Sequence, residues 1–333
     1  MKKKIKIALN DYPFFFSPAV GPNIFLQRLL KEFKNLDCDI TSKYNPLYDV
    51  GLFATHNKSF FNKPYALRIG GIFFDKKNTI TSTYKANKKI FKDIKDSHGV
   101  IFVCEFTKAL TEKLFGEIKK PNIVIQNSVS TNQFKPTGEN KREELKINKD
   151  EFVIVVSATW RRHKRLKEII IFFEKLSKKL DNITLIVLGN INEKLENLPN
   201  KVILVGKVNY NDLPSWYRTG NIYLHFAWID HGPNTHIEAT ACGLPSLSTN
   251  NGGAPEIIQN CNSGIVSYSD QEYKFELVDL YNPPEPDYDI LERDFMKIYN
   301  NYNSFKKGID FSPVSIDLAA KKYLQFLTLL VKN

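Results

Sequence analysis

Two carboxylates, Asp230 and Glu238, lie eight residues apart in the segment 228–256, which contains two expected turns. The apolar run 222–227 before them is typical of a buried strand. Pro233 suits the first turn of a helix, so Asp230 precedes the helix and Glu238 lies within it. A carboxylate held in this way can accept hydrogen bonds from the vicinal hydroxyls of a ribose, and a second one can accept them from the hydroxyls of a sugar.

Two glycine-containing turns, 231–235 and 251–253, each connect an expected strand to an expected helix. Ligands of open α/β sheets bind at the carboxyl ends of the strands, and the amides at a helix start favour anions. These turns therefore predict a region that binds phosphate. Its candidate residues are Gly232, Asn234, Thr235 and Gly253.

A basic loop, 161–165, follows the strand expected at 152–157 and precedes a helix expected at 167–180. Arginine offers a bidentate fork and lysine a point charge, so such a loop can neutralise a diphosphate. The alternative is a solvated basic loop without a ligand.

The composition indicates a globular protein of two ordinary domains, because 333 residues with 42% hydrophobic content can fill two cores. The net charge of +11 fits nucleic acid, an anionic membrane surface or phosphate-bearing substrates. Basic residues are spread along the chain, without an arginine-rich arm or a zinc-ligand pattern. We therefore expect no nucleic-acid partner.

The cysteines are well separated and outside C-x-x-C pairs, which indicates reduced thiols and a cytosolic protein: Cys38, Cys104, Cys242 and Cys261. The N-terminal run 1–16 is broken by Lys6, Asn10 and Asp11, so it predicts a first strand at 5–9 rather than a signal peptide. No stretch approaches the roughly 20 apolar residues of a membrane span.

Expected strands and helices alternate in both halves of the chain, which predicts an α/β fold with two domains joined by the polar segment 137–150. Further strands are expected at 49–55, 65–71, 99–104, 122–126, 183–188, 202–205 and 244–249, and further helices at 24–33, 76–95, 213–219 and 314–330. After residue 257 the sequence is read as irregular through 283–286.

Segments 238–245 (EATACGLP) and 252–256 (GGAPE) resemble the Glu-Ala-x-Ala-Cys-Gly-x-Pro and Gly-Gly-x-x-Glu segments of a known family. This is the large family of retaining glycosyltransferases, group 1, with GT-B architecture and an acidic-x7-Glu motif. Asp230 stands where the family usually has Glu, so the charge is kept with one methylene less. Segment 127–136 also resembles the family's Asn-Gly-Val-Asp-x-x-x-Phe-x-Pro.

The resemblance implies two Rossmann-like α/β domains facing across a cleft. We expect an acceptor-side domain at 1–138 and a donor domain at 139–313, with the helix 314–331 packed back on the first. The implied reaction moves a sugar from a nucleotide-diphosphate sugar to an acceptor hydroxyl, with retention, without a metal and without a cofactor. The acceptor class stays open among a glycan, a lipid-linked and a small-molecule acceptor.

The resemblance also assigns roles. Arg161 and Lys164, with Arg162 as the alternative arginine, match the family's phosphate-binding pair and act with Asp230 in catalysis. Glu238 would hold the ribose and Asp230 the donor sugar. On the acceptor side the candidates are Gly21, Asn23 and His56, and Gly70 replaces the acid of the family's Arg-x-Asp-Gly segment.

The basic helix expected at 76–95 reads either as a solvated face or as a peripheral contact with lipid headgroups or an acidic acceptor. Three other functions stay open for the whole chain. They are a nucleotide-sugar epimerase on the same fold, a non-catalytic relative that binds glycan or nucleotide sugar, and a basic nucleic-acid-binding protein.

Overall fold

The computed structural model describes residues 4–9, 21–54, 59, 61–76, 80–191 and 195–332. The chain divides into two compact units. Unit 1 comprises residues 1–130, 275–278 and 314–333, and unit 2 comprises residues 131–274 and 279–313.

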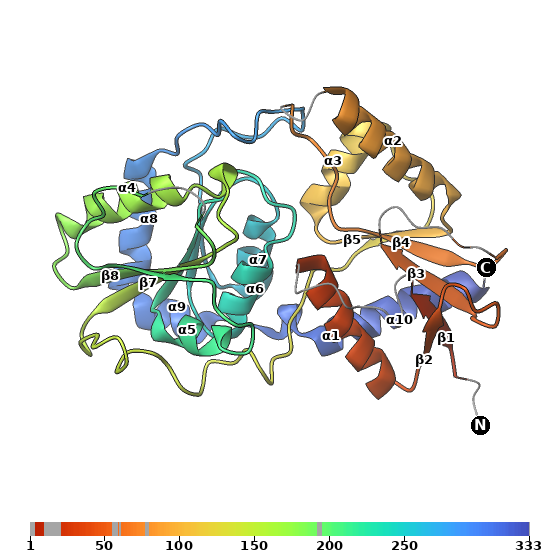
Figure 1. Ribbon diagram of the computed structural model, residues 1–333, viewed down its shortest axis with the longest axis horizontal. Coiled ribbons are helices and arrows are strands. Elements are labelled where there is room, and N and C mark those ends of the chain that lie inside the picture. The colour runs from red at the N-terminus through yellow and green to blue at the C-terminus, as the bar shows by residue number, and fades with distance from the viewer. Residues whose placement is uncertain are drawn as a thin grey trace. The chain divides into compact units, whose positions relative to one another are not determined.

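Unit 1 is built on a parallel six-stranded sheet in the order β2-β1-β3-β4-β5-β6 (Figure 1). Its sheet order reverses between β1 and β3. The strands are β1 (Lys6–Leu9), β2 (Asp39–Ser42), β3 (Val50–Ala54), β4 (Tyr65–Ile69), β5 (Gly99–Phe102) and β6 (Asn122–Val124), and the connecting helices are α1 (Gly21–Asn35), α2 (Ile80–Asp96) and α3 (Glu105–Phe115).

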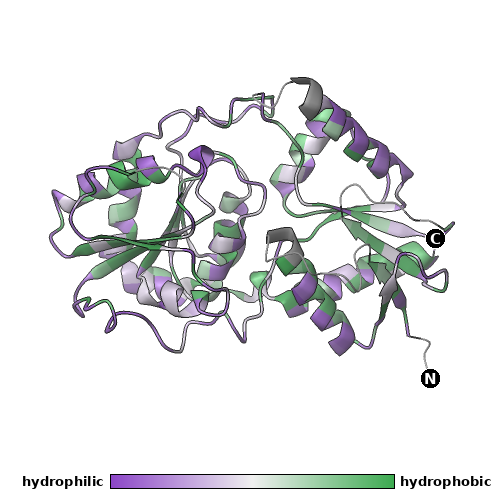
Figure 2. Cartoon of the chain, viewed as in Figure 1, coloured by the Kyte–Doolittle hydropathy of each residue, from purple (hydrophilic) through white to green (hydrophobic). Residues whose placement is uncertain are grey.

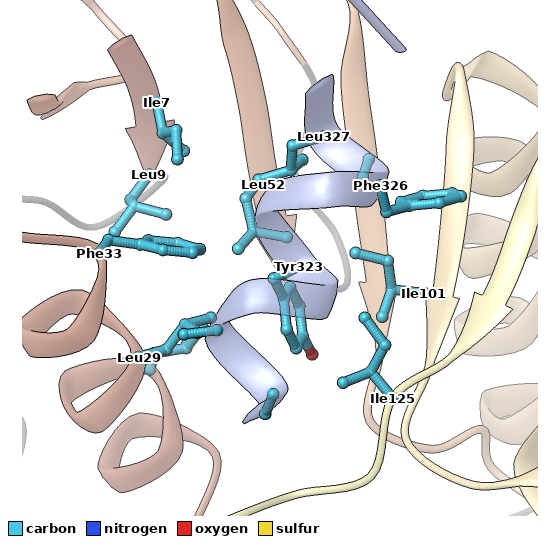
Figure 3. Packing of buried hydrophobic residues seen from close by; sticks show 14 of the residues in the cluster. Ile7, Leu9, Leu29, Phe33, Leu52, Ile101, Ile125, Tyr323, Phe326 and Leu327 are labelled. Atoms are coloured by element: carbon cyan, nitrogen blue, oxygen red, sulfur yellow. The ribbon is translucent and has the colours of Figure 1, made fainter. Parts of the chain in front are cut away.

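The last helix, α10 (Ile316–Lys332), completes the core of unit 1 by packing on α1, β3 and β4. Figure 3 shows Tyr323, Phe326 and Leu327 of α10 among the apolar side chains of the strands. A Cβ on Gly99 would lie 2.9 Å from the Phe326 ring, so the glycine lets this ring approach β5 closely. Residues from the two ends of the sequence thus share one core.

Unit 2 carries a second parallel six-stranded sheet, in the order β12-β11-β10-β7-β8-β9. The strands are β7 (Phe152–Ser157), β8 (Ile183–Leu188), β9 (Val202–Gly206), β10 (Ile222–His225), β11 (Ser246–Thr249) and β12 (Gly264–Ser267). The chain runs outward from β7 to β9 and then returns to the other side of β7 with β10. The strand order therefore reverses between β7 and β10.

Helices cover this sheet and join its strands. They are the short 3-10 turn η1 (Arg162–Lys164), α4 (Leu166–Ser177), α5 (Leu213–Thr219), α6 (Asn234–Ala241), α7 (Ala254–Cys261), α8 (Tyr288–Asn300) and α9 (Tyr302–Gly308). The 3-10 turn η2 (Ser312–Val314) follows where the chain passes from unit 2 back to unit 1. Two Rossmann-like units of this kind are the building blocks of the GT-B fold, which confirms the predicted fold class.

The expectation of irregular structure after residue 257 is wrong for part of that region. Helix α7 continues to Cys261, and β12 then pairs with β11. A four-residue strand is too short to show periodicity, which explains the error. Helix α8 follows, with the Asp287 carboxylate accepting hydrogen bonds from the amides of Asp289 and Ile290 as an N-cap.

All four cysteines are buried and free. Across the described ranges, no helix has both the length and the apolar character needed to cross a bilayer.

Candidate functional site

The reversal of strand order in unit 2 brings two loops together. Strands β7 and β10 are parallel neighbours, with Val155 opposite Tyr223. The η1 turn follows β7, and Asp230 and α6 follow β10. The carboxyl ends of the two strands therefore form the place where open α/β sheets bind ligands. A small cavity there is lined by Lys164, Tyr223 and His225, among others.

Lys164 and Asp230 form an ion pair at this position, with Lys164 Nζ donating to Asp230 Oδ2. Their side chains are 19% and 21% exposed, so both reach the surface. Burial raises the pKa of the Asp230 carboxyl, but the charge of Lys164, together with that of His225 once its ring is protonated at low pH, outweighs burial and lowers the pKa to about 2. Asp230 is therefore ionised at neutral pH and acts as a hydrogen-bond acceptor rather than as a proton donor.

Arg165, directly after the η1 turn, anchors this turn to the interior of unit 2. Its side chain is fully buried, and Nη1 donates to both carboxylate oxygens of Asp270 at 2.9 and 2.8 Å. Nη2 donates to the Pro284 carbonyl at 2.6 Å. The backbone of Arg165 is left-handed, with φ of 59°, where the turn passes into α4. This anchor holds the residue next to Lys164 and so restrains the backbone that carries the lysine.

The backbone around Asp230 is held from two sides. The amide of Gly253, after β11, donates to the Asp230 carbonyl at 2.8 Å, and the Trp228 amide donates to the His163 carbonyl at 2.9 Å. Gly252 has φ of +82°, and a Cβ there would lie 2.5 Å from the Asp230 carbonyl oxygen. Any larger residue at position 252 would displace Asp230.

Helix α6 begins beside Asp230. No side chain of the described part of the chain caps its start at Pro233. Thr235, in the first turn, accepts a hydrogen bond from the Tyr223 hydroxyl at 2.9 Å. The amides at such a helix start favour a bound anion.

Glu238 lies one turn further along α6 and is buried, at 3% exposure. Its Oε2 accepts a hydrogen bond from the Tyr217 hydroxyl at 3.3 Å. Burial and the charge of Glu238 raise the pKa of Tyr217 well above its usual value. The pKa of Tyr223 is raised by burial and by both Glu238 and Asp230, so Tyr223 lies within reach of the two acids.

Two buried imidazoles lie beneath the site. The rings of His225 and His236 stack with centroids 5.5 Å apart, and His236 also packs on Tyr223 at 5.5 Å. His225 Nε2 lies 4.0 Å from Asp230 Oδ2. Burial lowers the pKa of His225 to about 4 despite Asp230, and burial lowers that of His236 well below its usual value. Both rings are neutral at physiological pH.

The two candidate arginines differ in their surroundings. Arg162 pairs with the buried carboxylate of Glu168 at 2.6 Å. Arg161 is exposed, and its side chain makes no hydrogen bond or ion pair within the described part of the chain. Arg161 and Arg162 line a shallow hollow with Trp160. Arg161 is thus the guanidinium that a ligand can engage without breaking an ion pair.

The predicted residues of unit 2 therefore gather at one sheet edge, whereas those of unit 1 are less defined. Gly21 and Asn23 lie in the first turn of α1. His56 lies outside the described residues.

Four residues of the site escaped the sequence reasoning: Arg165, Asp270, His225 and His236. Arg165 was read only as part of a basic loop, and His225 only as part of a strand. The position of His225 at the carboxyl end of a strand in the motif stretch was the signal available for it. Within the described residues, no group of three or more His, Cys, Asp or Glu side chains could hold a metal ion.

Residues 138–278 match the family described as glycosyl transferases group 1. A phosphatidylinositol N-acetylglucosaminyltransferase GPI3 subunit from Saccharomyces cerevisiae is 26% identical over 167 residues, which cover 48% of this chain and 36% of that protein. An N-acetyl-alpha-D-glucosaminyl L-malate synthase from Bacillus anthracis is 26% identical over 161 residues, 45% of this chain and 42% of that protein. The chain thus spans less than half the length of these relatives.

Solved structures resemble the whole chain at low identity. A sucrose-phosphate synthase from Thermosynechococcus elongatus has a TM-score of 0.74 at 12% identity, covering 99% of this chain and 100% of that chain. Anabaena Alr3699/HepE in complex with UDP has a TM-score of 0.69 at 14% identity, covering 98% of this chain and 100% of that chain. These likenesses establish the fold.

Proposed function

Because residues 138–278 match the glycosyl transferases group 1 family, we propose that the chain moves a sugar from a nucleotide-diphosphate sugar to an acceptor hydroxyl. The observation that carries the proposal is the Lys164–Asp230 pair at the reversal of strand order, beside the start of α6. A cation, a carboxylate and helix-start amides at one sheet edge suit a diphosphate joined to a sugar.

Lys164 has three N–H donors and gives one to Asp230, so donors are left for a phosphate oxygen. Arg161 adds an exposed guanidinium from the same loop. Together with the first amides of α6, around Asn234 and Thr235, these charges stabilise the diphosphate as it leaves. No metal ion is needed for this step if the lysine and arginine carry the charge, so transfer should continue in the presence of EDTA.

Asp230 binds the hydroxyls of the donor sugar in this proposal. Its pKa of about 2 makes it a weak base and keeps it charged, which suits hydrogen bonding and excludes service as a general acid at neutral pH. Glu238 binds the ribose, and its bond to Tyr217 would orient the carboxylate for that contact. Retention at the anomeric carbon belongs to the same proposal, and NMR of the product tests it.

The nucleotide is tested first with UDP sugars, because a structural neighbour was solved with UDP and two relatives are named for N-acetylglucosaminyl compounds. Thermal shift with UDP-glucose, UDP-N-acetylglucosamine and a GDP sugar ranks the donors. A ligand at 100 times its Kd should stabilise the protein by about 2.7 kcal/mol. Glu238→Ala should weaken nucleotide binding in calorimetry, whereas Lys207→Ala, at an exposed site of unit 2, should leave it unaltered.

Transfer to an acceptor then decides between the functions that share this fold. A radiolabelled donor is incubated with lipid-linked, glycan and small-molecule acceptors, and with no acceptor. An epimerised product from donor alone would indicate an epimerase. Donor binding without hydrolysis or transfer would indicate a non-catalytic relative, and no binding of any nucleotide sugar would overturn the proposal.

A further inference from the structure

Helix α2 of unit 1 carries a row of lysines on its outer side, which we call the lysine stripe. The spacing of three and four residues places them on one face of the helix. All five side chains are exposed, and none pairs with a carboxylate within the described ranges: Lys85, Lys88, Lys89, Lys92 and Lys95.

The opposite side of α2 packs on the rest of unit 1, so the lysine stripe faces solvent. Ile90 and Ile94 are buried, and the Phe91 ring stacks on Phe115 of α3 with centroids 4.7 Å apart. At the end of the helix, Lys120 Nζ donates to the carbonyl of Ile94 at 2.7 Å. Figure 2 shows the hydrophilic residues along α2. The lysines are therefore held outward by packing.

Acidic groups do little to offset the stripe. Asp93 is buried, and the exposed Asp96, one turn after Lys92 at the end of the helix, offsets only one of the five charges. Lysines three and four residues apart repel one another and destabilise the helix that carries them. A surface of opposite charge would remove this repulsion.

Two exposed aromatic side chains lie on α2 or next to it. Tyr84, in α2, is 65% exposed, and Phe73 is 50% exposed. Asn87, one turn after Tyr84, holds the Phe73 backbone, donating to its carbonyl and accepting from its amide at 2.5 and 2.9 Å. Amphipathic aromatic rings favour the headgroup level of a bilayer, whereas a soluble polyanion would be held by charge alone. All five cations are lysines, which act as point charges rather than as forks for one phosphate.

We propose that α2 docks the protein on an anionic phospholipid surface, with the lysine stripe over the headgroups and Tyr84 and Phe73 at their level. The observations that carry this are the charge of five exposed lysines that pair with no carboxylate in the described part of the chain, and the exposed rings of Tyr84 on α2 and Phe73 next to it. The docking does not depend on the identity of the donor or on catalysis, so its test is separate from that of glycosyl transfer.

Co-sedimentation of the full chain with vesicles tests the proposal. Vesicles of phosphatidylcholine with 30% phosphatidylglycerol should bind the chain at low salt, and pure phosphatidylcholine should not. Each lysine near such a surface contributes about fivefold to partitioning. Changing Lys85, Lys88, Lys89 and Lys92 together to Gln should therefore lower partitioning at least fiftyfold, while glutamine preserves helix propensity.

The matched control changes four exposed lysines outside the stripe to Gln: Lys149, Lys207, Lys307 and Lys322. It removes the same charge and should reduce partitioning much less. Phe73→Ser with Tyr84→Ser should lower the binding that persists at high salt. Equal partitioning of the stripe variant and the control would overturn the proposal. So would stripe-dependent binding of a soluble polyanion such as heparin without any binding to anionic vesicles.

Discussion

Replacement of Arg165 by Met should destabilise unit 2 strongly, because it leaves a carboxylate buried without its cation. The Asp270 side chain is fully buried, and Arg165 supplies two hydrogen bonds to it, at 2.9 and 2.8 Å. Breaking a buried pair by removing one partner costs about 3–5 kcal/mol. The Pro284 carbonyl loses its donor as well. The ratio of folded to unfolded unit 2 should fall by about a thousandfold.

Tryptophan fluorescence reports this unit selectively, since all three tryptophans lie in unit 2: Trp160, Trp216 and Trp228. Urea titrations followed by tryptophan emission should be made for Arg165→Met, Asp270→Leu and the double variant. The double variant should be less destabilised than the sum of the single variants by about 1–3 kcal/mol, because it leaves no unpaired buried charge.

The matched control is Lys175→Met on α4, which breaks an ion pair with Asp289 of α8, whose side chain is 90% exposed. Its midpoint should stay within error of the parent. If the two single changes at the buried pair are simply additive, or if Arg165→Met behaves like Lys175→Met, the reasoning about the anchor is refuted.

Three further outcomes are expected. Lys164→Ala should lower kcat/KM for the nucleotide sugar more than tenfold, since a charge-assisted bond contributes about 1.5–3 kcal/mol. Steady-state kinetics measure this, with Lys207→Ala as the control. An unchanged kcat/KM in Lys164→Ala would show that the role assigned to Lys164 is wrong. His225 has a folded pKa of about 4, below its usual 6.5, so its contribution to stability is present above pH 6.5 and is lost as the pH falls toward 4. His225→Phe should therefore flatten the decline in urea stability across that window by up to about 1.4 kcal/mol per pH unit, and parallel curves would contradict this. Phe326→Ala should lower the stability of unit 1 by about 3–5 kcal/mol, seen in the circular dichroism melting of the helices, and a melt unaltered from the parent would show that this ring is dispensable.

Much of the fold was predictable because most of the inner strands are buried on both faces and form continuous apolar runs in the sequence. The sequence alternation predicted β8 and α5 with their observed bounds and the neighbouring elements within a few residues. The strand β12 was not predicted because four residues are too few to show the alternation of a strand. Helix α8 was overlooked although Leu291, Phe295 and Ile298 recur at helical spacing after the cap at Asp287.

The site was predictable to the extent that parallel neighbours end at one sheet edge. The Lys164–Asp230 pair joins residues 66 positions apart, and it follows from β7 and β10 being adjacent. The role of Arg165 could not be predicted, since a fully buried arginine in a basic loop depends on Asp270, 105 residues later. The sequence alone does not indicate which of several adjacent basic residues has its side chain buried.

The packing of α10 on the first sheet sets an order for synthesis on the ribosome. Strand β6 ends at Val124 and α10 begins at Ile316, about 190 residues later. At about 5–20 residues per second, translation needs roughly ten to forty seconds to cover that distance. The nascent sheet of unit 1 therefore waits with one apolar face covered only in part, by α1, while unit 2 is being made. Chaperones that hold exposed apolar surfaces have that interval in which to act, and unit 1 cannot complete its core before α10 has been made.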